Sequence, residues 1–212
     1  MEFEKIILFL VLLVSLTVHE WAHAFTADKL GDPLPRKQGR VTLDPRSHMD
    51  LIGTIILPII IIFVSPSFAI FGWGKPVQIS LPNKDKRKRD DILITLAGPF
   101  SNFAICLITV IFFSLWVSFS DISHSFYSVF FIIVNLNCTL LIFNLIPIPP
   151  LDGSHILKNA INMRPATYQY FSRYGFFILL VLINIPAFQS IIGDSIIILS
   201  GAFFSIFSQI IN

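Results

Sequence analysis

Long apolar runs are the feature of this sequence that most limits the folds open to it. Backbone inside a bilayer must satisfy its own hydrogen bonds, so a chain built from such runs is expected to be an all-α polytopic membrane protein. Hydrophobic residues make up 54% of the chain and charged residues 13%, where soluble domains have about 25% charged residues. Runs near the length that crosses a bilayer lie at 5–27, 51–72, 92–119, 124–148, 168–187 and 190–211.

Two short segments between the apolar runs have the pattern of β-strands. Residues 38–43 follow a helix stop at residues 30–33, and residues 75–81 follow a Gly-Trp-Gly sequence. We predict that the two segments form a small membrane-edge β-sheet. The expected fold is therefore a helical membrane protein with this sheet at its edge.

The first apolar run ends in the motif His19-Glu20-Trp21-Ala22-His23. A helix advances 3.6 residues per turn, so His19 and His23 lie on one face, where two imidazoles can bind one zinc ion with Glu20 beside them. This is the HExxH pattern, in which the glutamate is the general base of a metalloprotease. Ionisable residues inside a bilayer are costly and usually functional, which favours a zinc site within the membrane. The three fixed residues of this motif also occur together by chance. A third metal ligand elsewhere in the chain is therefore needed to support a zinc site.

Asp152 is the candidate for that ligand. It follows the proline-rich residues 147–150, which end the regular helix of the fourth apolar run. Backbone freed at membrane depth is tolerated where it is buried in protein or lines a wet cavity. A lone aspartate after prolines is usually a turn former or a helix cap. Catalytic zinc typically has three protein ligands, however, and a two-histidine motif in the same chain favours Asp152 as the third.

Helix direction constrains the second apolar run. The histidine motif and Asp152 both lie toward the C-terminal ends of their helices, so these helices must run in the same direction for the side chains to meet. A single crossing between them is enough, and the run at 92–119 supplies it. We therefore predict that 51–72 is a re-entrant hairpin, broken at Pro58 or at residues 65–67. The chain would have about five transmembrane helices plus the hairpin, or six helices if 51–72 spans the bilayer.

Positive charge indicates the orientation of the chain. The basic run at 84–89 precedes the third apolar run, and residues 36–46 carry further arginine and lysine. Short basic loops face the cytoplasm, which places the HExxH end of the first run toward the cytoplasmic side. The formal net charge of +2 follows this topology and gives no indication of nucleic-acid binding. Cys106 and Cys138 lie in apolar runs and provide no disulfide framework.

Three ordered motifs give the sequence a family resemblance. They are His19-Glu20-x-x-His23, Ala97-Gly98-Pro99-x-x-Asn102 and Asn144-x-x-Pro147-x-x-Pro150-Leu151-Asp152-Gly153. In this order and in hydrophobic helices, they resemble the site-2 protease family of intramembrane zinc metalloproteases, most of all the short bacterial and archaeal members that lack a PDZ domain. The resemblance extends over about residues 15–160. It implies a membrane catalytic core at 1–160, followed by a C-terminal transmembrane helix pair at 161–212.

The resemblance also implies roles for the motif residues. The zinc (Zn2+) cofactor would be bound by His19, His23 and Asp152. The catalytic base would be Glu20. Asn144 would help hold the substrate chain or the oxyanion, and Pro150 would bind the substrate. A substrate helix has its amides satisfied internally and must unwind before attack, so an edge strand at 38–43 or 75–81 is expected to pair with the unwound segment.

The implied activity is hydrolysis of peptide bonds in or near transmembrane segments, as in regulated intramembrane proteolysis. The expected partners are a transmembrane protein or peptide substrate and the lipid bilayer of a prokaryotic cell membrane, without nucleic acid, and the sequence is compatible with a homo-oligomer. The alternative is a non-hydrolytic ion or metal transporter that uses the same His, Glu and Asp residues. The lack of an inverted repeat in the sequence argues against a transporter.

Three further histidines require interpretation. His48 is either a gate or extra ligand for the zinc ion, or a loop histidine that hydrogen-bonds to its neighbours, and the second interpretation is favoured. His155 comes one turn after Asp152 and either orients it or is a surface residue; we expect a surface residue. His124 begins a helix and is expected to be solvated.

Overall fold

Four helices in the computed structural model are long and apolar enough to cross a membrane. The structure describes residues 2–64, 72–117, 119 and 124–211, and every regular element in these residues is a helix. The candidate spans are α1 (Glu2–Lys29), α4 (Arg87–Val117), α5 (His124–Asn144) and α8 (Pro186–Ile211). The all-helical expectation agrees with this, but the prediction of five or six transmembrane helices with a small β-sheet is wrong. The described residues contain four candidate spans and no strand.

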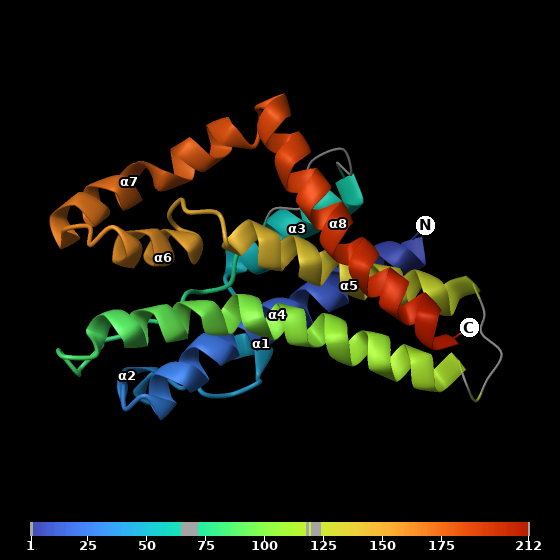
Figure 1. Cartoon of the computed structure of the whole chain (residues 1–212), viewed down its shortest axis with the longest axis horizontal. Helices are drawn as coiled ribbons and strands as arrows, with labels where there is room; N and C mark the ends of the chain where they lie inside the picture. Colours follow the sequence, from blue (N-terminus) through green and yellow to red (C-terminus); the bar gives the residue numbers. More distant parts are fainter. Residues whose placement is uncertain (1, 65–71, 118, 120–123, 212) are drawn as a thin grey trace.

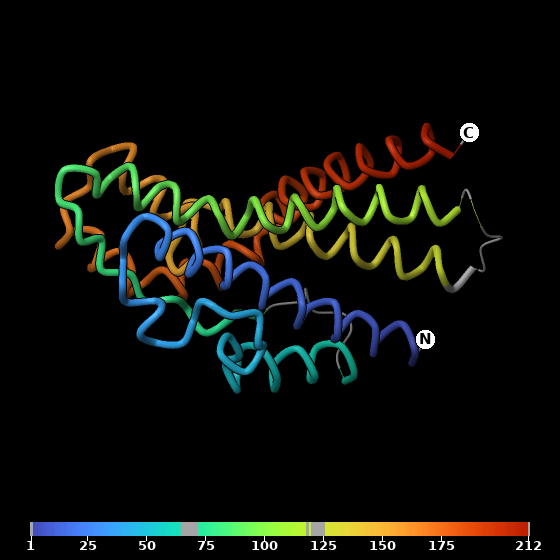
Figure 2. Tube along the Cα trace, turned by 90° about the horizontal axis from the view of Figure 1, so that it is seen from below, coloured from blue at the N-terminus to red at the C-terminus, as the bar shows by residue number. Residues whose placement is uncertain are grey.

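The helices α1, α4 and α5 lie along the long axis of the molecule, and α4 runs opposite to the other two (Figure 1). α4 packs against both α1 and α5, and α8 packs on α4 and α5 (Figure 2). α1 and α5 therefore run in the same direction, so residues near their C-terminal ends can meet. A short helix, α2 (Leu34–Lys37), follows α1, while α6 (Gly153–Ala160) and α7 (Pro165–Leu182) connect α5 to α8.

Aromatic side chains fill the contact between α4, α5 and α8. The ring centroid of the fully buried Phe130 is 4.4 Å from that of Phe207 and 5.1 Å from that of Phe113. Lipid tails are as apolar as these side chains, so close packing holds such helices together. Aromatic pairs at these separations contribute about 0.5–1.5 kcal/mol each. The cluster fixes α4 beside α5.

Side chains, and not a β-ladder, join the two segments that were expected to be strands. Gly39 has a positive φ of 67°, which places it in a turn after α2 and removes residues 38–43 from strand geometry. The buried guanidinium group of Arg40 donates hydrogen bonds to the backbone carbonyls of Ser47, Lys75 and Pro76. These bonds hold the irregular segment 72–81 beside the turn without strand pairing.

The two ends of the apolar run at 51–72 lie together. The Trp73 amide donates a hydrogen bond to the Gly53 carbonyl at 3.1 Å. The Thr54 hydroxyl donates to the Trp73 carbonyl at 2.7 Å. Because the chain leaves this run beside the point where it entered, the run is not a simple crossing.

The described part of this run is an apolar helix at Leu51–Val64, shorter than the candidate spans. It combines π-type turns with α3 (Leu57–Ile59). The helix continues through Pro58, so the prediction of a break at that residue is wrong. The other predicted break, at residues 65–67, lies outside the described residues.

The run predicted at 168–187 crosses a helix boundary. α7 ends at Leu182, and Pro186 begins α8. α7 is not among the candidate spans, because its first half carries polar side chains such as Gln169 and Arg173. Of the transmembrane pair expected at the C-terminus, only α8 is therefore a candidate span in the described chain.

Candidate metal centre

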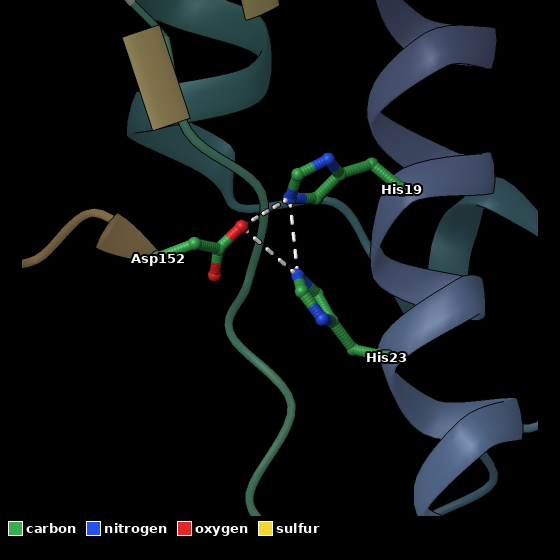
Figure 3. Close-up of side chains that lie close together, drawn as sticks. All are labelled: His19, His23 and Asp152. Carbon is green, nitrogen blue, oxygen red and sulfur yellow. Dashed lines mark hydrogen bonds and ion pairs between the residues drawn. The ribbon is translucent and has the colours of Figure 1, made fainter. Parts of the chain in front are cut away.

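The structure brings His19, His23 and Asp152 to one point (Figure 3). The Nε2 atoms of the two histidines are 3.1 Å apart. The Oδ2 atom of Asp152 is 3.2 Å from Nε2 of His19 and 3.3 Å from Nε2 of His23. One turn of α1 supplies both histidines, and the segment between α5 and α6 supplies the aspartate, so the site joins residues that are far apart in the sequence.

Hydrogen bonds at the other ring nitrogens fix the direction of both imidazoles. Nδ1 of His23 donates to the Ile94 carbonyl at 2.6 Å, and Nδ1 of His19 donates to Oδ1 of Asn102 at 2.7 Å. A carbonyl oxygen only accepts, so Nδ1 carries a proton in each ring, and Nε2 is the nitrogen that can bind a metal when the imidazole is neutral. Metal-binding histidines are oriented in the same way in other proteins.

When both imidazoles are neutral in this tautomer, the lone pairs of their Nε2 atoms and of Oδ2 of Asp152 face one another. The Oδ2 atom of Asp152 is buried and has no hydrogen-bond donor in the described chain. Such an arrangement is repulsive unless a cation lies between the three atoms. Ligand atoms about 2.0–2.1 Å from a tetrahedral zinc ion are about 3.3–3.4 Å apart. The observed separations of 3.1–3.3 Å thus fit a zinc ion closely.

A second layer of buried amides supports the histidine pair. Asn102 on α4 accepts from His19 and donates its Nδ2 to Oδ1 of Asn137 on α5 at 3.0 Å. Asn137 in turn donates to the Ile133 carbonyl at 2.9 Å. Both asparagines are fully buried. Asn137 was not predicted to have a role. It is one of three asparagines in the apolar run at 124–148, and the cost of such polar residues in a membrane was the signal that could have found it.

Gly98 allows α4 to approach the site. A Cβ atom at this position would lie 2.4 Å from Nε2 of His23 and 2.6 Å from Nε2 of His19. Any larger residue would therefore displace the imidazoles. The small residues of the second motif act here as a close contact between α4 and the histidine face of α1.

Glu20 lies in a cavity of about 440 Å³ beside the three converging side chains. The segment 72–81 forms one wall of this cavity, and at Gly74 a Cβ atom would lie 3.0 Å from Oε1 of Glu20. The cavity is also lined by Leu16, Ile94, Thr95, Leu140, Phe143, Asn144, Pro150, Leu151, His155 and Phe176. Glu20 is therefore placed where it can act on a group next to the metal position.

The other residues predicted for the site are distributed as follows. Asn144 and Pro150 line the cavity, and Nδ2 of Asn144 donates to the Leu140 carbonyl at 2.9 Å. His48 is not part of the cluster of converging ligands; Nε2 of its buried ring donates to the Thr42 carbonyl at 2.7 Å. His155 is not a plain surface residue, because it lines the cavity and bonds to a buried carboxylate. The side chain of His124 lies outside the described part of the chain.

Comparisons with known proteins give the family. A model of peptidase family M50 matches residues 117–183, which include Asp152. The "Putative zinc metalloprotease YwhC" of Bacillus subtilis is 35% identical over 189 residues, 84% of this chain and 80% of that protein. The "Putative zinc metalloprotease Rip2" of Mycolicibacterium smegmatis is 33% identical over 180 residues, 82% of this chain and 65% of that protein.

An archaeal relative is more distant. The "Zinc metalloprotease MJ0392" of Methanocaldococcus jannaschii is 27% identical over 159 residues, 74% of this chain and 35% of that protein. No solved structure matches the chain.

Two imidazoles and a carboxylate converge beside Glu20 in a bundle of membrane-length helices. This arrangement is a candidate metal site of the HExxH type. The chain belongs to peptidase family M50, the site-2 protease family. As a member of this family it is a membrane-bound zinc metalloprotease.

Proposed function

We propose that this protein hydrolyses peptide bonds in or near transmembrane segments of membrane proteins, with His19, His23 and Asp152 as zinc ligands and Glu20 as the general base. The observation that carries the proposal is the convergence of three potential ligand atoms, 3.1–3.3 Å apart, beside Glu20. When bound there, zinc supplies Lewis acidity that polarises a carbonyl and lowers the pKa of water to about 7.

The protein side chains divide the remaining work. The Nε2 atoms of the two histidines and Oδ2 of Asp152 hold the cation, and the amides of α4 and α5 keep the rings in place. Glu20 takes a proton from the attacking water and delivers it to the nitrogen of the leaving amine. The buried position of Glu20, 9% exposed, keeps bulk water from competing for that proton.

The irregular segment 72–81 is placed to hold an unwound substrate. It forms a wall of the cavity and is anchored by Arg40 through backbone carbonyls and by Asp32 through the Ser80 and Leu81 amides. A substrate that unwinds loses its internal hydrogen bonds and needs new partners. We propose that the backbone near Val77 provides them by pairing with the extended substrate.

The active site lies toward the cytoplasmic side in this proposal. The C-terminal end of α1 with α2, and the N-terminal end of α4 with the basic run 84–89, lie at the same end of the molecule (Figure 1). Lys88 of that run donates to Oδ1 of Asn162 at 3.0 Å, which places the residues after α6 there as well. Clustered lysine and arginine mark the cytoplasmic end of membrane helices.

The proposal is tested with Glu20→Gln in the full-length chain. A panel of epitope-tagged single transmembrane segments, co-expressed in bacterial membranes, reports cleavage by a shift in gel mobility. We expect cleavage of at least one segment by the wild type and a loss of about 10²–10⁴-fold in the variant, with zinc retained. Glu4→Gln, an exposed change on the same helix, serves as the matched control and should cleave normally.

Two results would contradict the proposal. One is undiminished cleavage by Glu20→Gln. The other is zinc-loaded wild type that cleaves no segment of the panel but moves zinc or another ion into proteoliposomes, because this result would favour the transporter.

A further inference from the structure

A buried carboxylate at the start of α4 holds one face of α6. Asp91 is 2% exposed and accepts hydrogen bonds from three α6 side chains. The donors are Nδ1 of His155 at 3.1 Å, Nζ of Lys158 at 2.7 Å and Nδ2 of Asn159 at 2.8 Å. Nothing in the proposed chemistry uses this cluster, yet one of its members, His155, lines the catalytic cavity.

The surroundings of His155 fix its ring. Lys158 forms an ion pair with Asp91, and Nδ1 of His155 donates a third hydrogen bond to the same carboxylate. The ring of Tyr168 packs edge-on against the imidazole at a centroid distance of 5.2 Å. Because Nδ1 bonds to Asp91, Nε2 is the ring nitrogen that remains for another hydrogen-bond partner. His155 therefore contributes a ring of fixed orientation to the cavity wall.

The position of this ring suits a substrate backbone. His155 comes one turn after Asp152, and its amide donates to the Asp152 carbonyl at 2.9 Å. Residues three apart in this geometry lie on the same side of the chain. A substrate peptide that reaches the metal position would therefore pass close to the imidazole. Its backbone N–H groups, freed by unwinding, cost free energy unless they find an acceptor.

We propose that His155 is a substrate-binding residue whose Nε2 accepts a hydrogen bond from a backbone N–H close to the scissile bond, and that Asp91 is a positioning residue that fixes the imidazole. The proposal rests on the proposed function of the same cavity. A purely structural role, in which Asp91 only anchors α6 to α4, is the alternative. The two roles predict different peptide affinities for a variant that lacks the imidazole of His155 but keeps the bonds from Lys158 and Asn159 to Asp91.

The test compares two probes on zinc-loaded, full-length protein in detergent. Acetohydroxamate binds zinc and has no peptide backbone, whereas a leucine tripeptide hydroxamate adds backbone N–H groups to the same zinc-binding head. His155→Phe removes both nitrogens and keeps a ring against Tyr168; His155→Gln keeps an acceptor. Asn159→Ala is the matched control, because it removes one bond to the same carboxylate from a side chain that is outside the cavity lining.

We expect His155→Phe to weaken binding of the tripeptide hydroxamate about 10-fold or more, as for loss of a buried hydrogen bond, and to leave acetohydroxamate affinity unchanged. His155→Gln should restore part of the loss, and Asn159→Ala should bind both probes like the wild type. His155→Ala, which needs no new packing, replaces the phenylalanine variant if the latter does not fold.

Two outcomes would overturn the substrate contact. Equal tripeptide affinity in wild type and His155→Phe would show that the imidazole does not touch the peptide. A parallel loss of both probes would show that His155 acts through the metal ligands. Failure of the proposed function looks different, because zinc-loaded wild type would then cleave no transmembrane segment of the panel, whatever its affinity for the two hydroxamates.

Discussion

His19 and Asn102 are joined inside the helix bundle by a hydrogen bond of 2.7 Å between Nδ1 and Oδ1. The bond links α1 to α4, and Asn102 continues it to Asn137 on α5. The three helices therefore share one buried polar chain that ends at the proposed metal position. Orientation of a metal ligand by such a chain is worth about 10- to 100-fold in metal affinity in other proteins.

We predict that Asn102→Leu lowers zinc affinity about 10- to 100-fold, since His19 loses the partner that fixes its tautomer and ring plane. Competition with a chelator of known affinity measures the change. Asn135→Leu is the matched control: it removes a half-buried asparagine of α5 whose side chain donates to the Phe131 carbonyl. Equal zinc affinity in Asn102→Leu and wild type would contradict the assigned role.

Gly98→Ala should abolish zinc binding without unfolding the chain. The added Cβ would lie 2.4 Å from Nε2 of His23, closer than non-bonded atoms approach, so the imidazoles must move. Gly201→Ala on α8, where no atom lies within 4 Å of the added carbon, is the control and should bind zinc normally. Zinc content and thermal unfolding of both variants check the prediction. Full zinc in Gly98→Ala would mean that the histidine face is more open than described.

Val77→Pro tests substrate pairing along the segment 72–81. Proline removes the backbone N–H, so cleavage should fall sharply while zinc content stays at the wild-type level. Val77→Ala keeps the N–H and should retain most of the activity. The transmembrane-segment panel described above provides the measurement. Normal cleavage by the proline variant would rule out pairing at this position.

Asp32 gives a pH dependence that does not involve the metal position. Burial raises the pKa of its carboxyl group, but hydrogen bonds from the Ser80 hydroxyl and from three backbone amides outweigh this and hold the pKa below its ordinary value. A pKa that is lower in the folded than in the unfolded chain stabilises the fold above the unfolded value of about 3.9. This contribution is lost as the pH falls through the folded value.

We therefore expect Asp32→Asn to unfold at a lower temperature than the wild type at pH 7, with a difference that shrinks as the pH falls below about 4. Thermal unfolding in detergent across this range measures it. Asp44→Asn, at an exposed position, controls for general charge effects. A constant difference between wild type and Asp32→Asn at all pH values would contradict the linkage.

The convergence of the three candidate ligands could be predicted from the sequence better than their surroundings. The four-residue spacing of His19 and His23 is a property of any helix, and the requirement for a third ligand identified Asp152; the structure brings all three together. The amide chain through Asn137 depends on how α4 and α5 pack, and no spacing within one helix shows that. The resemblance to the site-2 protease family is confirmed by the comparisons.

The errors in the predicted fold also have physical causes. Residues 38–43 and 75–81 have the sequence pattern of β-strands. The positive φ of Gly39 turns the first segment out of strand geometry, and the side chain of Arg40 bonds to the backbone of the second segment in place of a β-ladder. The hydropathy pattern predicted one apolar run at 168–187, but this run contains the end of α7 and the start of α8, which begins at Pro186. In each case the structure depends on a single residue. A pattern averaged over many residues does not show such an effect.

Zinc per chain in the purified protein tests the central claim most directly, with wild type measured beside Asp152→Ala and, as a control, Asp194→Ala on α8. If His19, His23 and Asp152 form the metal site, the wild type and Asp194→Ala will each contain about one zinc ion, and Asp152→Ala will contain little or none after dialysis. Full zinc in Asp152→Ala, or no zinc in the wild type, would contradict the claim.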